Sequence, residues 1–458
     1  MRYRILGLAA LAVMLLAAAA AASLEPEAQE RGRVHQHLAY RGDEGCGCGG
    51  SALCSHLPLI VIDTGGQRIP GALAEGMDRF GQAVYTTSED GLPVITAQVA
   101  VIDNAGANNH LTDPPALKAA ADFRIRGNSS RRFPKLPYLL DLKDGEGNNL
   151  DYPMMGMDAH HEWALHGPIL DKSLIRNYMW YNISGEIMEY APNVRFCELV
   201  LNGRHQGLYL MVETITNGDD CRLPLRLDTK NAEATGYLLR VDRPTETELE
   251  SIRDVYTFAE RDGQIAQDIA IRYPGRGRLT EALKKSIELD VSAFEKAIFS
   301  YDYNTGQYGY WNWVDVDSFV DYFLINEFTK NSDAGGYSTY LYKEVGGKFK
   351  LCVWDFNNVC DNFREEVQEP ENFLMVKRFW YFMMLKDEAF VERLLARYGE
   401  LRRGVLSEAY LMNYIDETLD WLGPAIDRNN DRWGDEMANW EGLMPPERNI
   451  HSHREGVE

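Results

Sequence analysis

Basic side chains are scarce in this chain of 458 residues. Lysine and arginine number 47 against 69 aspartates and glutamates, so the formal net charge is −22. A protein this acidic repels the phosphate backbone of DNA and RNA, which argues against a nucleic-acid-binding protein. The composition still allows one small phosphate ligand, held by local positive groups or by a metal. Hydrophobic residues make up 45% and charged residues 25%, which is typical of globular proteins and argues against a multi-span membrane protein.

The N-terminus carries an apolar run at residues 5–22, which follows Arg2 and Arg4. Small residues crowd its end, and the sequence AAAS at 20–23 offers a cleavage site. This pattern predicts a secretory signal peptide over residues 1–23. An uncleaved membrane anchor is the alternative, but half of the run is weakly hydrophobic alanine. We therefore expect a protein that is secreted or lies in the cell envelope or periplasm, and that meets a membrane only if the segment is uncleaved.

Seven cysteines follow the apolar run, and an odd number leaves at least one thiol unpaired within the chain. Cys46, Cys48 and Cys54 lie close together in a glycine-containing stretch. They suit either a disulfide-linked loop or a metal knuckle, for which His56 is the nearest fourth ligand. We favour the disulfide. Cys352 and Cys360 bracket a short polar turn and predict a second disulfide.

Hydrophobic patterning predicts an α+β protein in which a β-rich half precedes a mostly helical half. We place a linker at 24–56, a β-rich N-terminal lobe at 57–250, a helical C-terminal lobe with one hairpin at 251–445 and a polar tail at 446–458. Predicted strands lie at 58–63, 92–103, 121–126, 138–142, 194–200, 207–212, 236–241, 337–342 and 349–353. Asn-Gly at 202–203 predicts a tight hairpin turn. Helices are expected at 172–190 with Asp171 as N-cap, at 278–300 and from 316 to 328, and after residue 371 with a break at Pro424.

Three polar stretches are candidates for chemistry. The stretch 124–135 is the most basic part of an acidic chain, and its glycine and small polar residues let backbone N–H groups approach an anion, with Arg126 or Lys135 to neutralise charge. The alternative is a solvated hairpin loop. The other two contain Asp333 and Asp355, which suit a general base and an Mg²⁺ ligand but also ordinary turns. Because these aspartates flank one predicted hairpin, both can reach one face of a cleft, with Ser338 and Asn357 nearby.

Several motifs together resemble the spore coat protein H (CotH) kinase family. They are RGNSS at 126–130, FPK at 133–135, DKSLIRN at 171–177, NG at 202–203, GLYLMVE at 207–213, NSD at 331–333 and WDFN at 354–357. The resemblance covers roughly residues 57–440. It implies a bilobal, atypical protein-kinase-like fold, and a kinase that uses ATP and Mg²⁺ as cofactors.

The resemblance also implies roles for individual residues. Asp333 is the expected catalytic residue, and Asp355 the expected Mg²⁺ ligand, with Asn357 and Ser338 as further metal ligands. Lys135 is expected at the ATP phosphates with Arg126, and Glu213 ends the strand expected beside the adenine. The chain departs from ordinary kinases in two ways: it has Ser338 where they have asparagine, and it lacks their glycine-rich loop. The acidic partner of Lys135 is left open between Glu186 and Glu189.

These features predict a secreted or envelope-associated Mg²⁺-dependent kinase that phosphorylates serine or threonine hydroxyls of a protein, such as a surface or coat protein. Two alternatives use the same residues differently. One is a non-catalytic surface or coat assembly protein that keeps the fold. The other is a transferase that acts on a non-protein acceptor.

Overall fold

The computed structural model describes residues 46–48, 53–77, 83–104, 106–218, 222–228, 234–243, 249–252, 268–360, 362, 371–378, 380–438 and 453. The predicted signal peptide, most of the predicted linker and nearly all of the predicted tail lie outside these residues. Among the helices of the described ranges, none has both the length and the apolar character that crossing a membrane requires.

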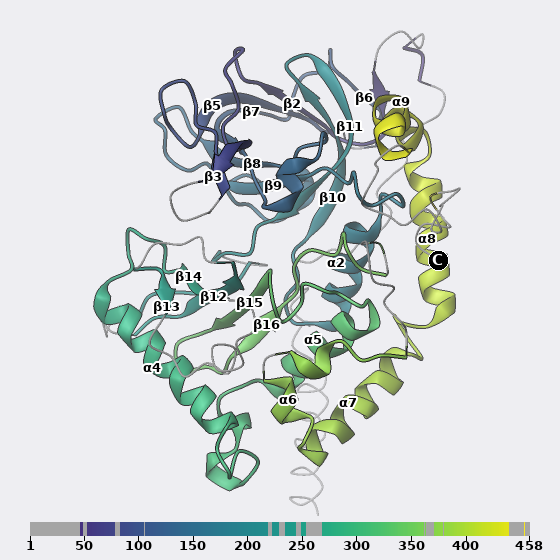
Figure 1. Ribbon diagram of the computed structural model, residues 1–458. Helices are drawn as coiled ribbons and strands as arrows, with labels where there is room; N and C mark the ends of the chain where they lie inside the picture. The colour runs from purple at the N-terminus through teal and green to yellow at the C-terminus, as the bar shows by residue number, and fades with distance from the viewer. Residues whose placement is uncertain are drawn as a thin grey trace, which may run out of the picture. The chain divides into compact units, whose positions relative to one another are not determined.

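The described chain combines strands and helices, so the α+β prediction is confirmed (Figure 1). The strands are β1 (Cys54–Ser55), β2 (Leu59–Asp63), β3 (Leu73–Met77), β4 (Ala83–Tyr85), β5 (Ile95–Ile102), β6 (Asn109–His110), β7 (Leu117–Ile125), β8 (Tyr138–Lys143), β9 (Glu162–His166), β10 (Val194–Leu201), β11 (Arg204–Glu213), β12 (Tyr237–Asp242), β13 (Ser251–Ile252), β14 (Asp268–Tyr273), β15 (Thr339–Lys343) and β16 (Lys350–Cys352). The α-helices are α2 (Arg176–Ile187), α4 (Glu281–Ile298), α5 (Val316–Phe328), α6 (Tyr381–Met384), α7 (Glu388–Leu401), α8 (Glu408–Leu422) and α9 (Pro424–Ala438).

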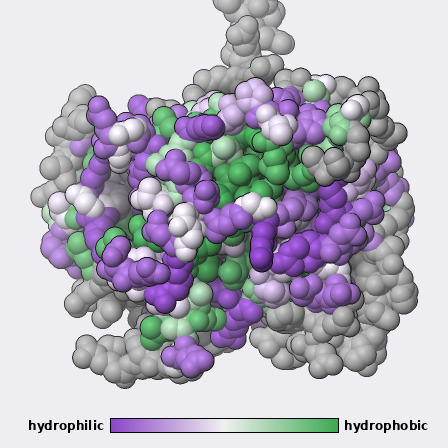
Figure 2. Space-filling view, turned by 90° about the horizontal axis from the view of Figure 1, so that it is seen from above, coloured by the Kyte–Doolittle hydropathy of each residue, from purple (hydrophilic) through white to green (hydrophobic). Residues whose placement is uncertain are grey.

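Seven strands close into a barrel in the order β10-β11-β9-β8-β7-β5-β2. Alternate residues point inward, as Ile95, Ala97 and Val99 of β5 do, and they fill the interior with apolar side chains. In the view from above the molecule as drawn in Figure 1, apolar residues gather in the middle of the surface, with hydrophilic residues around them (Figure 2). The turn between β10 and β11 has Asn202 and Gly203 at φ 50° and 73°, as the Asn-Gly signal predicts. The barrel closes through β2 and β10, which run parallel.

A second sheet has the order β13-β14-β12-β15-β16, and its described strand pairs are antiparallel. It takes β12 from the part of the chain before residue 250 and its other strands from after it. The predicted hairpin is present as β15 and β16. Because β12 hydrogen-bonds with β15, the end of β12 lies beside the segment that leads into the hairpin.

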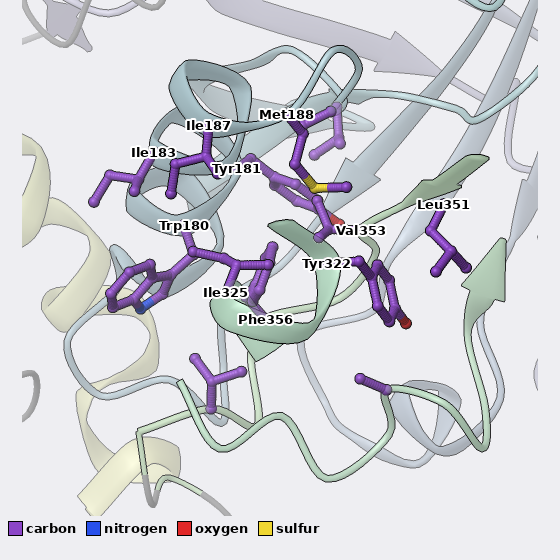
Figure 3. Packing of buried hydrophobic residues seen from close by; sticks show 14 of the residues in the cluster. Trp180, Tyr181, Ile183, Ile187, Met188, Tyr322, Ile325, Leu351, Val353 and Phe356 are labelled. Atoms are coloured by element: carbon purple, nitrogen blue, oxygen red, sulfur yellow. The ribbon is translucent and has the colours of Figure 1, made fainter. Parts of the chain in front are cut away.

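Helix α2 is the structural centre of the larger hydrophobic core. Eleven of its twelve residues are buried, including polar Arg176 and Asn177. Its apolar side chains, among them Trp180 and Tyr181, face Ile325 of α5 and Phe356 after β16 (Figure 3). The expectation that Asp171 caps this helix is wrong, because the helix starts five residues later. Leu174 has a φ of 69°, and the Asp171 carboxylate instead accepts the Arg176 N–H at 2.8 Å and pairs with the Arg176 guanidinium at 2.6 Å.

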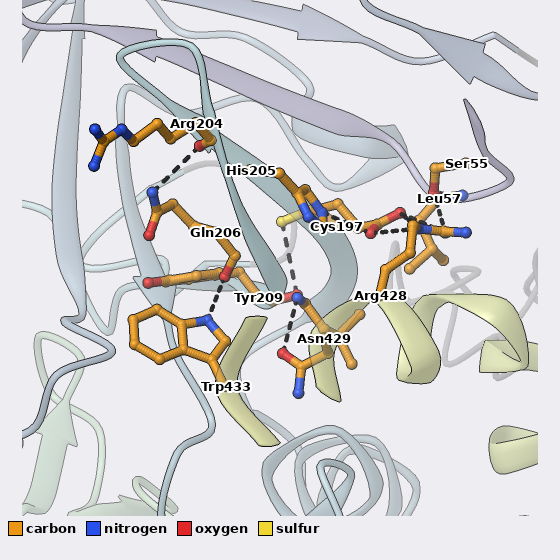
Figure 4. A network of polar contacts seen from close by, with 12 residues as sticks. Ser55, Leu57, Cys197, Arg204, His205, Gln206, Tyr209, Arg428, Asn429 and Trp433 are labelled. Atoms are coloured by element: carbon orange, nitrogen blue, oxygen red, sulfur yellow. Dashed lines mark hydrogen bonds and ion pairs between the residues drawn. The ribbon is translucent and has the colours of Figure 1, made fainter. Parts of the chain in front are cut away.

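Helix α9 packs against β11 of the barrel and brings a buried ion pair with it (Figure 4). The Arg428 guanidinium lies 2.7 Å from the carboxylate of Glu198, a residue of β10 whose side chain is fully buried. His205 contacts the same carboxylate at 2.9 Å. Burial alone would raise the pKa of Glu198, but the hydrogen bonds from His205 and Arg428 lower it to about 2. The pair therefore fixes α9 to the barrel.

We predict that Arg428→Ala destabilises the protein by about 3 kcal/mol, since it leaves a buried carboxylate without its main partner. Arg432→Ala is the matched control, because Arg432 lies on the same helix and its ion pair with Glu436 is exposed. Loss of an exposed pair costs at most about 1 kcal/mol. Urea unfolding of both variants measures the difference, and equal losses would contradict this role for Arg428.

Candidate active site

A cavity of about 460 Å³ lies where the β7–β8 connection meets the second sheet and the loops before β15 and after β16. The β7–β8 connection contributes Arg126 and residues 127–131, and the end of β12 contributes Arg240, Asp242 and Arg243. Asp333, Ser338, Asp355 and Asn357 also line it. The structure therefore brings five of the seven predicted site residues into one cavity.

Asp333 and Asp355 form the acidic wall, and Asn331 links the two segments that carry them. The side-chain oxygen of Asn331 accepts the Asp333 N–H at 3.2 Å, and its amide nitrogen donates to the Asp355 carbonyl at 3.2 Å. Asn331 is itself buried and also donates to Asn326 of α5. One buried amide thus joins the backbone segments that carry the two carboxylates.

The loop that carries Asp355 is held by α2. The Tyr181 hydroxyl accepts the Asp355 N–H at 2.9 Å, and the Asn177 side chain accepts the Phe356 N–H at 2.7 Å. Arg176 donates from Nε to the Val359 carbonyl at 3.1 Å. Asp355 has a φ of 64°, a strained conformation for a residue with a Cβ atom. These hydrogen bonds therefore maintain a backbone conformation that Asp355 would not adopt by itself.

Both carboxylates resist ionisation in the absence of a cation. Burial, and next the neighbouring Asp333 carboxylate, raise the pKa of Asp355 from 3.8 to about 7. Burial also raises the pKa of Asp333, although Arg243 opposes this. The effect of Asp333 on Asp355 shows that the two charges act on each other within one site.

The oxygen atoms at this wall suit a hard divalent cation. The Asn357 side chain lies against the Asp355 carboxylate, and its amide nitrogen donates to that carboxylate when the amide is turned. Carboxylate and amide oxygens are typical ligands of Mg²⁺, so the residues present fit this ion.

The cavity also carries many positive charges. Five arginines line the cavity against three aspartates, a local excess of positive charge in a strongly acidic chain. The Arg126 guanidinium lies 5.2 Å from the Trp354 ring centroid, and the Arg243 guanidinium lies 3.9 Å from that of Tyr337. Stacking of this kind holds a guanidinium group in place while its N–H groups remain able to bind an anion.

Gly127 shapes the basic loop. Its φ is 92°, and a Cβ atom added there would lie 2.0 Å from the Ser130 hydroxyl oxygen. The turn therefore requires glycine. The backbone that follows, residues 129–132, forms a short 3₁₀ turn beside the cavity.

Two predicted residues lie away from the cavity. Lys135 is fully buried, and its ammonium group donates to Asn429 of α9 at 2.6 Å and lies 5.0 Å from the Tyr209 ring centroid. Burial lowers the pKa of Lys135 well below its ordinary value. Glu213 is buried and accepts the Asn193 N–H at 2.9 Å. The structure does not bring either side chain to Asp333 and Asp355.

The two glutamates considered as partners of Lys135 make other contacts. Glu186 accepts from the Tyr410 hydroxyl at 2.7 Å, and Glu189 pairs with Lys350 at 2.7 Å. The buried side chain that Lys135 reaches is therefore the amide of Asn429 on α9, and not the carboxylate of either glutamate.

The predicted disulfide between Cys352 and Cys360 is not formed. Cys352 is buried in a small cluster with Tyr190 and Leu238, whereas Cys360 packs against the larger core. The loop after β16 is instead held by the hydrogen bonds from α2.

The cavity residues that escaped prediction include His166, Arg240, Asp242 and Arg243. The last three stand together at the end of β12, and this cluster of charges at a strand end was the available signal. His166 is held by Asn177 at 3.1 Å, and burial, followed by Arg126, lowers its pKa to about 4. Its neutral ring adds a polar group to the basic side of the cavity.

Asp333, Asp355 and Asn357 thus share one cavity with five arginines. Comparison with known proteins shows the family of the chain. The CotH kinase protein family model matches residues 123–445, more than half of the chain, so this chain belongs to the CotH family. It is 23% identical over 245 residues to the inner spore coat protein H of Bacillus subtilis (strain 168). That match covers 52% of this chain and 58% of the relative's length.

We predict that the pH dependence of stability changes in Asp355→Asn. The pKa of Asp355 is raised in the folded state, so the folded protein keeps a proton that the unfolded chain releases between pH 3.8 and about 7. Stability of the wild-type protein therefore falls across this window by up to about 1.4 kcal/mol per pH unit from this group. The asparagine variant lacks this contribution. Urea unfolding in EDTA at pH 5 and 8 should show the variant gaining relative to wild type at pH 8, and parallel profiles would contradict the raised pKa.

Proposed function

We propose that the protein is an Mg²⁺-dependent phosphotransferase that binds ATP in this cavity and transfers its γ-phosphate to a serine or threonine hydroxyl of a protein. One observation carries the proposal: Asp333 and Asp355 line one cavity together with the basic loop at 126–131. Phosphoryl transfer depends on such positioning and charge neutralisation more than on covalent chemistry. A volume of about 460 Å³ is within the range of small-molecule sites.

Each wall has its own part in this proposal. Arg126, Arg240 and Arg243 would bind the phosphates, together with the backbone of residues 127–130. Asp355 and Asn357, with Ser338 beside them, would hold Mg²⁺, which when bound supplies further neutralisation of phosphate charge. Asp333 would orient the acceptor hydroxyl and accept its proton, a role that its raised pKa favours.

The proposal includes a bilobal, kinase-like fold with two differences from ordinary kinases. The glycine-containing loop at 126–130 takes the place of a glycine-rich loop, and arginines take the place of the phosphate-binding lysine, since Lys135 is turned to Asn429. These differences leave the two aspartates in their expected relation on either side of the β15–β16 hairpin.

The acceptor and the location are inferred from the relative and from the N-terminus. The Bacillus subtilis relative is named as an inner spore coat protein, and residues 1–23 have the pattern of a signal peptide. We propose a secreted or coat-associated protein that modifies a surface or coat protein. An assembly protein without activity would keep the cavity but would not turn over ATP.

The test compares two variants of the acidic wall. Asp355→Ala should abolish Mg²⁺-dependent ATP binding in calorimetry, because a methyl group cannot bind the ion. Asp333→Ala should retain nucleotide binding and lower the rate of phosphate transfer by about 10²- to 10⁴-fold.

Asp317→Ala serves as the control, because this exposed aspartate pairs with Arg393 on the surface. It should behave as wild type in both assays. Nucleotide binding that survives Asp355→Ala, or an unchanged transfer rate in Asp333→Ala, would contradict the assigned roles. Binding without transfer in wild type would favour the assembly protein.

A second prediction concerns the basic loop. Gly127→Ala should weaken ATP binding at least about tenfold, because the Cβ atom must displace the Ser130 side chain, which lines the cavity. Gly147→Ala is the matched control: its φ of 86° carries the same backbone strain, yet nothing lies within 4 Å of an added Cβ. Equal affinities in the two variants would exclude the loop from the phosphate site.

A further inference from the structure

A second cluster of chemically active side chains lies outside the cavity. The thiols of Cys46, Cys48 and Cys54 and the imidazole of His110 place their ligand atoms within 4.8 Å of one another. None of these four residues lines the cavity. The structure forms no disulfide among the three cysteines, contrary to the preference stated from the sequence, and the fourth member is His110 in place of His56.

Backbone pairing brings these residues together from distant parts of the chain. Strand β1 pairs with β6, and this register sets Cys54 directly opposite His110. The Cys46 sulfur lies 3.2 Å from Nε2 of His110. The Cys46-Gly-Cys48 segment thus supplies two thiols to a corner that the small β1–β6 sheet already defines.

The surroundings orient His110 toward the thiols. Its Nδ1 lies 3.2 Å from the Asp113 carboxylate, and this carboxylate also accepts the His110 backbone N–H at 2.9 Å and the Asn104 amide at 2.7 Å. An Nδ1–H that donates to Asp113 leaves the lone pair of Nε2 facing the sulfurs. A carboxylate behind a histidine is the usual support of a metal-binding imidazole.

A further donor faces the thiols. The Asn108 amide donates to the Cys54 sulfur at 3.2 Å. Hydrogen bonds of this type stabilise a thiolate, the form of cysteine that binds metals.

We propose that Cys46, Cys48, Cys54 and His110 bind one structural Zn²⁺ ion. Three thiolates and one imidazole make a closed tetrahedral set, the type that structural zinc sites use and that leaves no position for substrate. Bond lengths of about 2.3 Å to sulfur and 2.0 Å to nitrogen place tetrahedral ligands about 3.5–3.8 Å apart, so the separations in the cluster need to change by no more than about 1 Å. Binding releases the three thiol protons to solvent.

The ion would fix the start of the described chain to the barrel. Directly after Cys54, the Ser55 hydroxyl accepts from the Leu57 N–H at 3.0 Å and from Arg428 of α9 at 3.2 Å. Leu57 is fully buried, and β2 of the barrel follows it. Zinc would therefore join the segment before β2 to strand β6. This junction lies next to Ser55, where α9 contacts the chain through Arg428.

The test is the metal content of the full-length protein, purified with reduced thiols in the presence of Zn²⁺ and then desalted. Elemental analysis should find one zinc per chain. His110→Gln should lower this content at least about tenfold. The matched control is His161→Gln, since His161 also contacts a carboxylate, that of Asp151 at 2.8 Å, but has no part in the thiol cluster.

A measurement on the wild-type protein covers the case in which His110→Gln does not fold. Titration of the native protein with a mercurial reagent should release one zinc, detected by a chromogenic chelator, as three thiols react. A wild type without zinc, a disulfide among Cys46, Cys48 and Cys54 in its intact mass, or full zinc content in folded His110→Gln would overturn the proposal. These readouts do not involve ATP, so their outcome is independent of the proposed phosphotransferase.

Discussion

The hydrogen bonds from α2 to the loop after β16 are the constraint on which the candidate site depends. Arg176, Asn177 and Tyr181 are buried with the helix, and together they fix the backbone of residues 355–359. That backbone holds Asp355 at a positive φ and keeps its carboxylate beside Asp333 against their mutual repulsion. Since α2 lies in the larger core, its packing stabilises a charge arrangement that would not persist on a free loop.

Much of the fold could be predicted because local signals carry it. The alternating pattern of β5, the Asn-Gly turn of β10–β11 and the periodic apolar face of α5 each depend on residues close in sequence. The barrel's closure could not be predicted in this way. It requires the parallel pairing of β2 with β10, about 140 residues apart in the chain, and hydrophobic alternation does not specify which strands pair.

The candidate site divides in the same way into features set by residues close in sequence and features set by contacts between distant segments. Asp333 and Asp355 could be assigned because they flank one hairpin, so their proximity is a local property. The position of the Lys135 side chain could not be predicted, because its ammonium group binds Asn429 of α9, which is 294 residues later in the chain. Arg240 and Arg243 reach the cavity only through the pairing of β12 with β15. In the thiol cluster, the spacing of the cysteines was visible, but the register that sets His110 opposite Cys54 was not.

The central claim is that the cavity between the Arg126 loop and Asp355 binds the phosphates of ATP. A crystal structure with Mg²⁺ and a non-hydrolysable ATP analogue tests it most directly. The phosphates should lie between the backbone of residues 127–130 and the oxygens of Asp355 and Asn357, with Asp333 facing the γ-phosphate. A nucleotide bound elsewhere, such as beside Lys135 and α9, or bound with its phosphates away from Asp355, would contradict the claim.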